Sequence, residues 1–332
     1  KSGYYSTAAS VLEDLRQADE TGIIDLILEH RELSKLKGTY VDALPELVNP
    51  QTGRIHSSLN QTGSVTGRIA SNSPNLQNIP VRSEAGQRIR RGFVAREGWS
   101  LLAADYSQVE LRILAHVCQD EALLRAFRRD QDIHRATAAA VYGVDIDEVT
   151  FRQRQFAKNV NFGLIYGMGP YRLARESGLT LAEAENYIKE YFERFPGIED
   201  YLSNTKRQAR EKGYVETLLG RRRYFPIFQA RTRANREMVA RSEREAINHP
   251  IQGTAADIIK IAMIDLDRRL HEAGYEACMI LQIHDELLLE VPDEELGDVR
   301  DLVLETMSGA FELDVPLKVE VSSARNWLEL KS

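Results

Sequence analysis

The segment spanning residues 99–118, WSLLAADYSQVELRILAHVC, constrains the fold more than any other part of the chain. Residues 99–104 form a short apolar run, and Asp105 follows it directly. From Ser107 onward, apolar residues recur four positions apart, which is typical of a helix. The segment therefore predicts a strand, then a helix, with the Asp105 carboxylate at the edge of a sheet where it can meet a metal or a substrate.

A second acid occupies a comparable position near the C-terminal end. Residues 279–283 and 287–291 are apolar runs, and His284, Asp285 and Glu286 separate them. This pattern predicts a hairpin with acids at its turn. Many aspartates merely end strands, so Asp105 alone is a weak signal, but two acids that end two apolar strands indicate a functional site.

Composition limits the classes of protein to which the chain can belong. Its 332 residues, 43% of them hydrophobic and 28% charged, are typical of a soluble enzyme with two or three structural units. No run approaches the roughly 18 apolar residues of a membrane span. Cys118 and Cys278 have no C-x-x-C spacing, which favours reduced thiols, so we expect oxygen ligands for any metal. The sequence begins with Lys1 rather than with Met, so we expect it to be a fragment of a longer cytoplasmic protein.

Charge is distributed unevenly along the chain. The formal net charge is −7, yet residues 201–245 hold 12 basic and 5 acidic side chains, whereas residues 281–332 hold 4 basic and 13 acidic ones. A basic segment beside an acidic one suits an anionic polymer that is guided over metal-binding acids. A solvated helical face explains such a charge run equally well, and both interpretations stay open.

Residues 152–167, RQRQFAKNVNFGLIYG, place Arg154, Lys158, Phe162 and Tyr166 four apart. On a helix each such step rises about 6 Å and drifts about 40°, so the four side chains form a stripe about 18 Å long. Two cations followed by two aromatic rings match the phosphates, sugar and base of a nucleoside triphosphate. Core packing with a snorkelling edge is the alternative. The chain has no G-x-x-x-x-G-K-[ST] motif, so side chains and metal would hold the triphosphate.

The remaining patterns predict an α+β protein. Most of the chain between Asp105 and Arg244 reads as helical, and Thr180 with Glu183 predicts a capping box. Residues 254–270 predict a buried helix, and residues 317–321 alternate as a strand does. Together with the strands at the two acids, this strand predicts a mostly antiparallel sheet.

Three segments closely resemble motifs A, B and C of the family A DNA polymerases, the bacterial DNA polymerase I group. They are DYSQVELR from Asp105, the helical segment 154–167 and QIHDE from Gln282. TGRIASNSPNLQNIP, DIHRATA, GYVETLLGRRR and QGTAADIIK are similar to the same family in the same order. The resemblance implies a right-hand polymerase with an antiparallel palm sheet. It places a truncated helical thumb base at 1–45, the palm at 46–110 and 244–332, and large helical fingers at 111–243.

The activity that this resemblance implies is template-directed DNA synthesis in replication or repair. A monomer would add deoxynucleoside triphosphates to the 3′ end of a primer paired with template DNA and release pyrophosphate. Two Mg²⁺ ions would be held by Asp105, Asp285 and the backbone carbonyl of Tyr106. The catalytic residues would be Asp105, Asp285 and Lys158, with Lys158 a candidate proton donor to pyrophosphate.

The resemblance also implies two sets of binding residues. The incoming nucleotide would contact Arg154, Lys158, Phe162, Tyr166, His134, Gln108 and Glu110. The primer and template minor groove would contact Arg68, Asn75, Gln77, Arg244, Asn248, Gln252 and His284, where base pairs present common acceptors. Glu110 is expected to occupy the space that a ribose 2′-hydroxyl would need, although Ser107 and Glu110 also have the spacing of a capping box.

Three other functions are alternatives to this one. A single-subunit RNA polymerase shares the fold, but Glu110 favours DNA synthesis. An inactive scaffold that binds primer and template is disfavoured because both aspartates and Lys158 are retained. An HD-type phosphohydrolase would use His284 and Asp285, but such doublets belong on helices with more histidines nearby.

Overall fold

The computed structural model describes residues 5–80, 83–230 and 235–331. The chain divides into two compact units. Unit 1 comprises Lys1–Asn60, Ala70–Leu101 and Ser323–Ser332, and unit 2 comprises Gln61–Ile69 and Leu102–Ser322. Each unit has its own buried residues, and each is described by itself below.

Unit 1 is built from short helices and two small antiparallel hairpins. Its elements are α1 (Ala9–Leu15), η1 (Arg16–Ala18), α2 (Ile23–Leu36), η2 (Lys37–Val41), α3 (Ala43–Glu46), β1 (Val48–Asn49), β2 (Arg54–Ile55), β3 (Ser58–Asn60), β4 (Ala70–Asn72), η3 (Leu76–Asn78), α4 (Glu84–Arg91) and η5 (Glu329–Lys331). Strand β1 pairs with β2, and β3 pairs with β4. Trp327 is buried between the Arg90 guanidinium, 4.4 Å from its ring centroid, and the Phe93 ring. This contact anchors the C-terminal segment.

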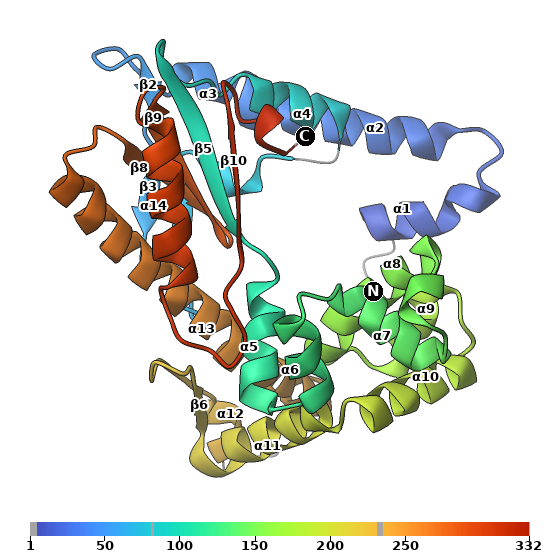
Figure 1. The fold of residues 1–332 in the computed structure, drawn as a ribbon. Coiled ribbons are helices and arrows are strands. Elements are labelled where there is room, and N and C mark those ends of the chain that lie inside the picture. The colour runs from blue at the N-terminus through green and yellow to red at the C-terminus, as the bar shows by residue number, and fades with distance from the viewer. Residues whose placement is uncertain (1–4, 81–82, 231–234, 332) are drawn as a thin grey trace. The chain divides into compact units, whose positions relative to one another are not determined.

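The four-stranded sheet lies mainly in unit 2 and has the order β10-β5-β9-β8. Its strands are β5 (Trp99–Tyr106), β8 (Cys278–Ile283), β9 (Glu286–Pro292) and β10 (Val319–Ala324). These are the four segments expected to be strands, and β8 pairs with β9 in antiparallel register. Every residue of β9 is buried, as expected for a strand inside the sheet. Helices α13 (Arg236–Ala273) and α14 (Leu296–Ser308) pack on each other and beside the sheet (Figure 1).

The other elements of unit 2 form a helical region around one large apolar core. They are α5 (Val109–Cys118), α6 (Glu121–Arg128), α7 (Ile133–Tyr142), η4 (Ile146–Glu148), α8 (Phe151–Ile165), α9 (Pro170–Ser177), α10 (Leu181–Arg194), α11 (Pro196–Lys212), β6 (Tyr214–Glu216), β7 (Arg222–Tyr224) and α12 (Pro226–Gln229). The predicted capping box of Thr180 and Glu183 is confirmed at the start of α10. The structure therefore has the α+β class that the sequence predicts.

Helix α13 is much longer than the predicted 254–270 segment. It begins at Arg236 and continues through Pro250, which lacks the amide hydrogen of a normal helical residue. Ile247 and Ile251, on either side of this proline, are fully buried, and the Thr254 hydroxyl donates to the Pro250 carbonyl. Burial of this face outweighs the local cost of the proline, so tertiary packing overrides the helix propensity.

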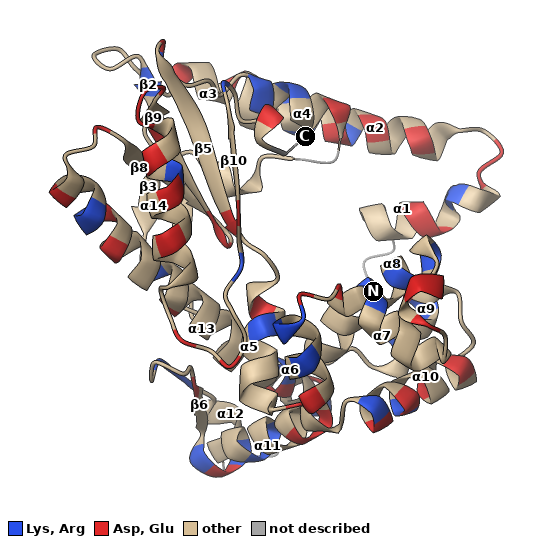
Figure 2. Ribbon diagram, in the orientation of Figure 1, with Lys and Arg blue, Asp and Glu red and all other residues tan. Residues whose placement is uncertain are grey.

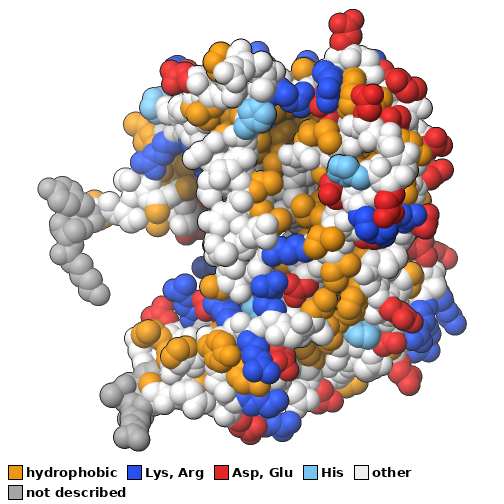
Figure 3. All heavy atoms as spheres, turned by 90° about the vertical axis from the view of Figure 1, so that its left-hand side faces the viewer, with side chains coloured by type: hydrophobic (Ala, Val, Ile, Leu, Met, Phe, Trp, Pro, Cys, Tyr) orange, Lys and Arg blue, Asp and Glu red, His pale blue; other side chains and the backbone are white. Residues whose placement is uncertain are grey.

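Charged side chains of both signs are mixed over the helical surface (Figure 2). Several arginines of the basic segment 201–245 form ion pairs, namely Arg210 with Glu243, Arg221 with Asp257, Arg222 with Glu216, and Arg223 and Arg241 with Glu245. Part of the basic excess is thus compensated locally. Apolar side chains such as Ile264 and Ile280 also reach the surface, and Figure 3 shows stretches of apolar side chains with charged ones around them. No helix in the described ranges is both long and apolar enough to span a bilayer.

Candidate functional site

The two predicted metal-binding acids lie at neighbouring strand ends in unit 2. Asp105 is the penultimate residue of β5, and Asp285 lies in the turn between β8 and β9. The Tyr106 amide donates a hydrogen bond to the Asp285 carbonyl, with an N···O distance of 3.1 Å. The Tyr106 hydroxyl donates to the Met307 carbonyl at 2.7 Å and ties this end of β5 to α14. The backbone thus brings both acids together, although they are far apart in sequence.

A charged cluster of Arg68, Glu110 and Asp285 forms beside these strand ends. Arg68 Nη2 donates to Glu110 Oε1 at 2.6 Å. Burial raises the pKa of Glu110 to about 7, because the attraction of Arg68 does not offset the lost hydration and the charge of Asp285 adds to the rise. Burial also raises the pKa of Asp285, while Arg68 and His284 lower it. Arg68 therefore compensates two partly buried carboxylates at once.

The start of α5 corrects one interpretation of the sequence. The N-cap of α5 is Gln108, and no side chain caps its first turn. The Ser107 amide donates to the Lys318 carbonyl, and the Glu110 carboxylate binds Arg68. The capping-box interpretation of Ser107 and Glu110 is therefore wrong, and Glu110 is held toward the acids instead.

Two residues that flank the acids have unusual backbone conformations. Gln108 has φ 55° and His284 has φ 53°, both in the left-handed region that residues other than glycine seldom adopt. Such strain costs on the order of 1 kcal/mol per residue or more and persists only where the surroundings enforce it. Gln108 lies three residues after Asp105, and His284 directly precedes Asp285. The strained residues thus lie beside both acids, which supports a functional site there.

The available ligands fit Mg²⁺. Asp105, Asp285 and the Tyr106 carbonyl offer only oxygen, and Mg²⁺ is commonly bound by one or two carboxylates while water and substrate phosphates complete its shell. Across the described ranges, no three His, Cys, Asp or Glu residues are grouped so that they could hold a metal by themselves. An HD-type phosphohydrolase would need such a group, and His284 lies in a turn rather than on a helix. The described residues therefore offer no support for that alternative.

Arg154, Lys158 and Phe162 of the predicted stripe lie on α8, and Tyr166 is its C-cap. A capping box of Thr150 and Gln153 begins this helix. Lys158 is exposed, and Arg154 is half-buried with its Nε 2.5 Å from Asp132 Oδ2. At the other end the rings of Phe162 and Tyr166 stack, with centroids 6.5 Å apart and an interplanar angle of 25°. The helix and its C-cap thus carry the two cations and the two rings in the predicted order, and their contact with a triphosphate stays a prediction.

His134 belongs to a buried polar network between α7 and α8. It is only 2% exposed, so a nucleotide contact from it requires neighbouring side chains to move. Asn161 Nδ2 donates to His134 Nδ1 at 3.1 Å and to the Thr137 hydroxyl at 2.9 Å, and that hydroxyl in turn donates to the Ile133 carbonyl. Burial lowers the pKa of His134 to about 4. The lowered pKa favours the neutral imidazole at neutral pH.

Helix α13 connects the end of α8 with the acids. Arg244, Asn248 and Gln252 follow one another at four-residue intervals, and the Arg244 side chain lies against Gly167, just after α8. The same spacing continues to Lys260, which lines a cavity of about 10 Å³ with Asp285. Arg68, Gln282 and His284 line this cavity too. Along the axis of α13, the distance from Arg244 to Lys260 is about 24 Å.

Two predicted DNA-binding residues lie in unit 1. Asn75 Oδ1 accepts from the Gln77 amide at 3.0 Å, and Gln77 Oε1 accepts from the Ser71 amide at 3.2 Å. These bonds shape the loop after β4. Arg68, Arg244, Asn248, Gln252 and His284 all belong to unit 2, so within one unit the structure groups five of the seven predicted DNA contacts.

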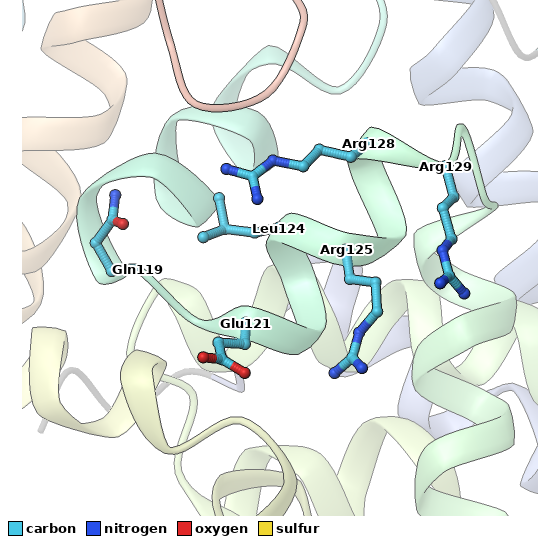
Figure 4. Close-up of a pocket in the computed structure, with 6 residues that line it drawn as sticks. All are labelled: Gln119, Glu121, Leu124, Arg125, Arg128 and Arg129. Atoms are coloured by element: carbon cyan, nitrogen blue, oxygen red, sulfur yellow. The ribbon is translucent and has the colours of Figure 1, made fainter.

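Three features of unit 2 were not predicted from the sequence. Asp132 binds Arg154, and Asn161 binds His134. A cavity of about 570 Å³ also lies along α6, lined by Gln119, Glu121, Leu124, Arg125, Arg128 and Arg129 (Figure 4). The Arg128 side chain extends over Leu124 there, and its Nε donates to the Asp314 carbonyl. The one sequence signal for Asp132 was that an aspartate at the start of a predicted helix is a favourable N-cap.

Comparisons with known proteins identify the family. The family model described as DNA polymerase family A matches residues 1–329. The chain is 54% identical over 331 residues to "DNA polymerase I, thermostable" of Thermus filiformis, which covers all of this chain and 39% of that protein. It is 51% identical over 327 residues to DNA polymerase I of Pseudomonas aeruginosa, which covers 98% of this chain and 35% of that protein.

A solved structure is similar over the whole chain. It is the POL domain of Pol1 from M. smegmatis in complex with DNA primer-template and dNTP, with a TM-score of 0.94 and 44% sequence identity. The match covers 100% of this chain and 58% of that one. The chain thus spans well under half the length of the curated relatives named above.

Proposed function

The chain belongs to DNA polymerase family A, and from this membership and its site we propose that it catalyses template-directed DNA synthesis. Deoxynucleoside triphosphates are added to the 3′ end of a primer paired with a template, and pyrophosphate is released. The observation that best supports this proposal is the hydrogen bond from the Tyr106 amide to the Asp285 carbonyl. This bond places Asp105 and Asp285 on neighbouring backbone segments. We assign residues 1–45 to the base of a thumb, 46–110 and 244–332 to the palm, and 111–243 to the fingers.

Asp105, Asp285 and the Tyr106 carbonyl would hold two Mg²⁺ ions. When bound, such a pair supplies activation of the primer 3′-oxygen and stabilisation of the leaving pyrophosphate. Arg154 and Lys158 bind the triphosphate through charge-assisted hydrogen bonds, and the Lys158 ammonium donates a proton to the pyrophosphate oxygen. The stacked rings of Phe162 and Tyr166 lie at the sugar and base.

DNA contacts come from polar side chains that read no particular base. In the minor groove the acceptors are largely common to all base pairs. Arg68, His284 and the α13 stripe of Arg244, Asn248 and Gln252 donate to them, with Asn75 and Gln77 from unit 1. Such contacts test the shape of the newly formed pair rather than its sequence.

A primer-extension assay tests the proposal. A labelled primer annealed to a longer template should be extended with deoxynucleotides and Mg²⁺, and a chelator should stop the reaction. Preferential use of ribonucleotides would indicate an RNA polymerase. The curated relatives named above are both DNA polymerases. Tight DNA binding without extension under any metal condition would indicate an inactive scaffold.

Glu110 is expected to exclude ribonucleotides. Its carboxylate is held by Arg68 within the cluster that includes Asp285, where a side chain can fill the volume of a 2′-hydroxyl. Glu110→Ala should raise the ratio of ribonucleotide to deoxynucleotide kcat/KM by more than about tenfold, which corresponds to about 1.4 kcal/mol. Glu110→Gln keeps the volume and should keep most of the discrimination. If the alanine variant only melts at a lower temperature while the ratio stays constant, Glu110 is a structural residue.

A further inference from the structure

One carboxylate joins the two helices that carry the proposed triphosphate contacts. Asp132 precedes α7, and its Oδ1 accepts from the amides of His134 at 2.9 Å and Arg135 at 3.2 Å. Its Oδ2 accepts from Nε of Arg154 on α8 at 2.5 Å. Asp132 is therefore both the N-cap of α7 and the ion-pair partner of Arg154.

The geometry of this ion pair leaves the phosphate-binding edge of Arg154 available. A guanidinium presents five N–H donors in a rigid plane, and Asp132 is bonded through Nε. Over the described residues, the two terminal nitrogens of Arg154 make no hydrogen bond or ion pair. They can therefore bind a phosphate bidentately while Nε stays on Asp132.

The pair is also sheltered enough to be more than a surface contact. The side chains of Arg154 and Asp132 are 33% and 29% exposed. Burial raises the pKa of Asp132, but the hydrogen bonds from Arg154 and from the amides of Arg135 and His134 outweigh it and keep the pKa below its usual value. The carboxylate is thus charged at neutral pH and attracts Arg154 continuously.

We propose that Asp132 is a positioning residue for the incoming nucleotide, because it holds the Arg154 guanidinium and the start of α7 in one arrangement. This inference rests on the proposed function and deepens it. Asp132 itself does not touch the nucleotide. Asp132 acts through Arg154. Because it binds Nε, the two terminal nitrogens of Arg154 face away from Asp132. Asp132 also caps α7, the helix that carries His134.

Competition between Asp132 and the phosphates for Arg154 would have the opposite effect. In that case loss of the Asp132 charge would tighten nucleotide binding. The bond to Nε favours positioning, because a competing carboxylate would occupy the terminal nitrogens that phosphate needs. Loss of the charge should therefore weaken binding.

Asp132→Asn is the informative variant. Asparagine is as good an N-cap as aspartate, so α7 keeps its cap while Arg154 loses its anion. The neutral bonds from Asn161 to His134 and Thr137 still join the two helices, so the fold should persist. Asp132→Ser, another uncharged N-cap, provides a second variant if the first melts early.

Nucleotide affinity is measured on the wild-type protein and its variants with a dideoxy-terminated primer-template, so that binding is followed without turnover. Asp132→Asn should raise the Kd for the matching nucleotide by about fivefold to tenfold while the Kd for DNA and the melting temperature stay constant. In an Arg154→Ala background it should add nothing, because the aspartate acts through the arginine. Asp145→Asn, a cap on η4 that forms no ion pair in the described residues, is the matched control and should behave as wild type.

Three results would overturn the assignment. They are an unchanged Kd in Asp132→Asn, a lower Kd, or an equal rise in Kd with and without Arg154. Extension by the wild-type protein is measured on the same preparation with an unblocked primer. If wild type extends primers but the double-mutant cycle shows no coupling, the role of Asp132 is wrong and the proposed function stands. If wild type binds no nucleotide, both fail.

Discussion

Primer extension is expected to fall by more than about a thousandfold when Asp105 or Asp285 is replaced by alanine, which corresponds to about 4 kcal/mol of transition-state stabilisation. Each substitution removes one of the two carboxylates proposed to hold metal at the meeting point of β5 and the β8–β9 turn. Binding of primer-template should change little, because the proposed DNA contacts lie on other residues. Single-turnover extension and DNA affinity, measured on the same preparations, check both parts.

Stability should not explain the loss of activity. Burial raises the pKa of Asp285, so its charged form is disfavoured by the fold, and alanine relieves that cost. We therefore expect the Asp285→Ala variant to melt no lower than wild type in the absence of metal. Asp301→Ala, an exposed substitution on α14, is the matched control and should keep full activity. A variant at Asp105 or Asp285 that retains a tenth of wild-type turnover would refute the two-metal assignment.

The second large effect is expected at Lys158, which is exposed on α8. Lys158→Ala should lower kcat/KM for nucleotides by about a hundredfold or more. It loses a charge-assisted phosphate contact worth about 1.5 to 3 kcal/mol and also a general acid, which typically contributes at least about a hundredfold. Steady-state and single-turnover kinetics at several nucleotide concentrations measure the two losses.

Lys158→Arg separates the two roles. Arginine keeps the positive charge but does not release its proton, so it should restore nucleotide affinity without restoring the rate. Lys189→Ala, on α10 and paired only with Glu193 among the described residues, is the control for loss of an exposed lysine. Full activity of Lys158→Arg would show that the side chain serves charge alone. Unchanged kinetics in Lys158→Ala would remove the phosphate stripe from the mechanism.

Consecutive residues were sufficient to predict the elements that carry the site. The apolar run before Asp105, the two runs around Asp285 and the four-residue spacing from Arg154 to Tyr166 correspond to β5, the β8–β9 hairpin and α8. Strand alternation and helical period are properties of neighbouring positions, so a sequence displays them directly. The family resemblance added roles to these residues, and the matches to DNA polymerase family A confirm the family.

Two local predictions failed where distant residues compete with local ones. The S-x-x-E spacing of Ser107 and Glu110 predicted a cap, but Arg68, 42 residues earlier, takes the Glu110 carboxylate. The predicted helix 254–270 was too short, because α13 begins at Arg236 and passes through Pro250, where the residues on both sides are buried. In each case a buried charge pair or a packed core contributes more than the local preference.

The sequence by itself therefore determined the strands, the helices and the chemical groups that they carry. Only the tertiary structure decided which of these groups meet. The bond between the Tyr106 amide and the Asp285 carbonyl depends on β5 pairing beside β9, and Asp132 reaches Arg154 across 22 residues. Such pairings follow from how sheets and helices bury their apolar faces against one another, a property of the whole core that no short stretch of residues encodes.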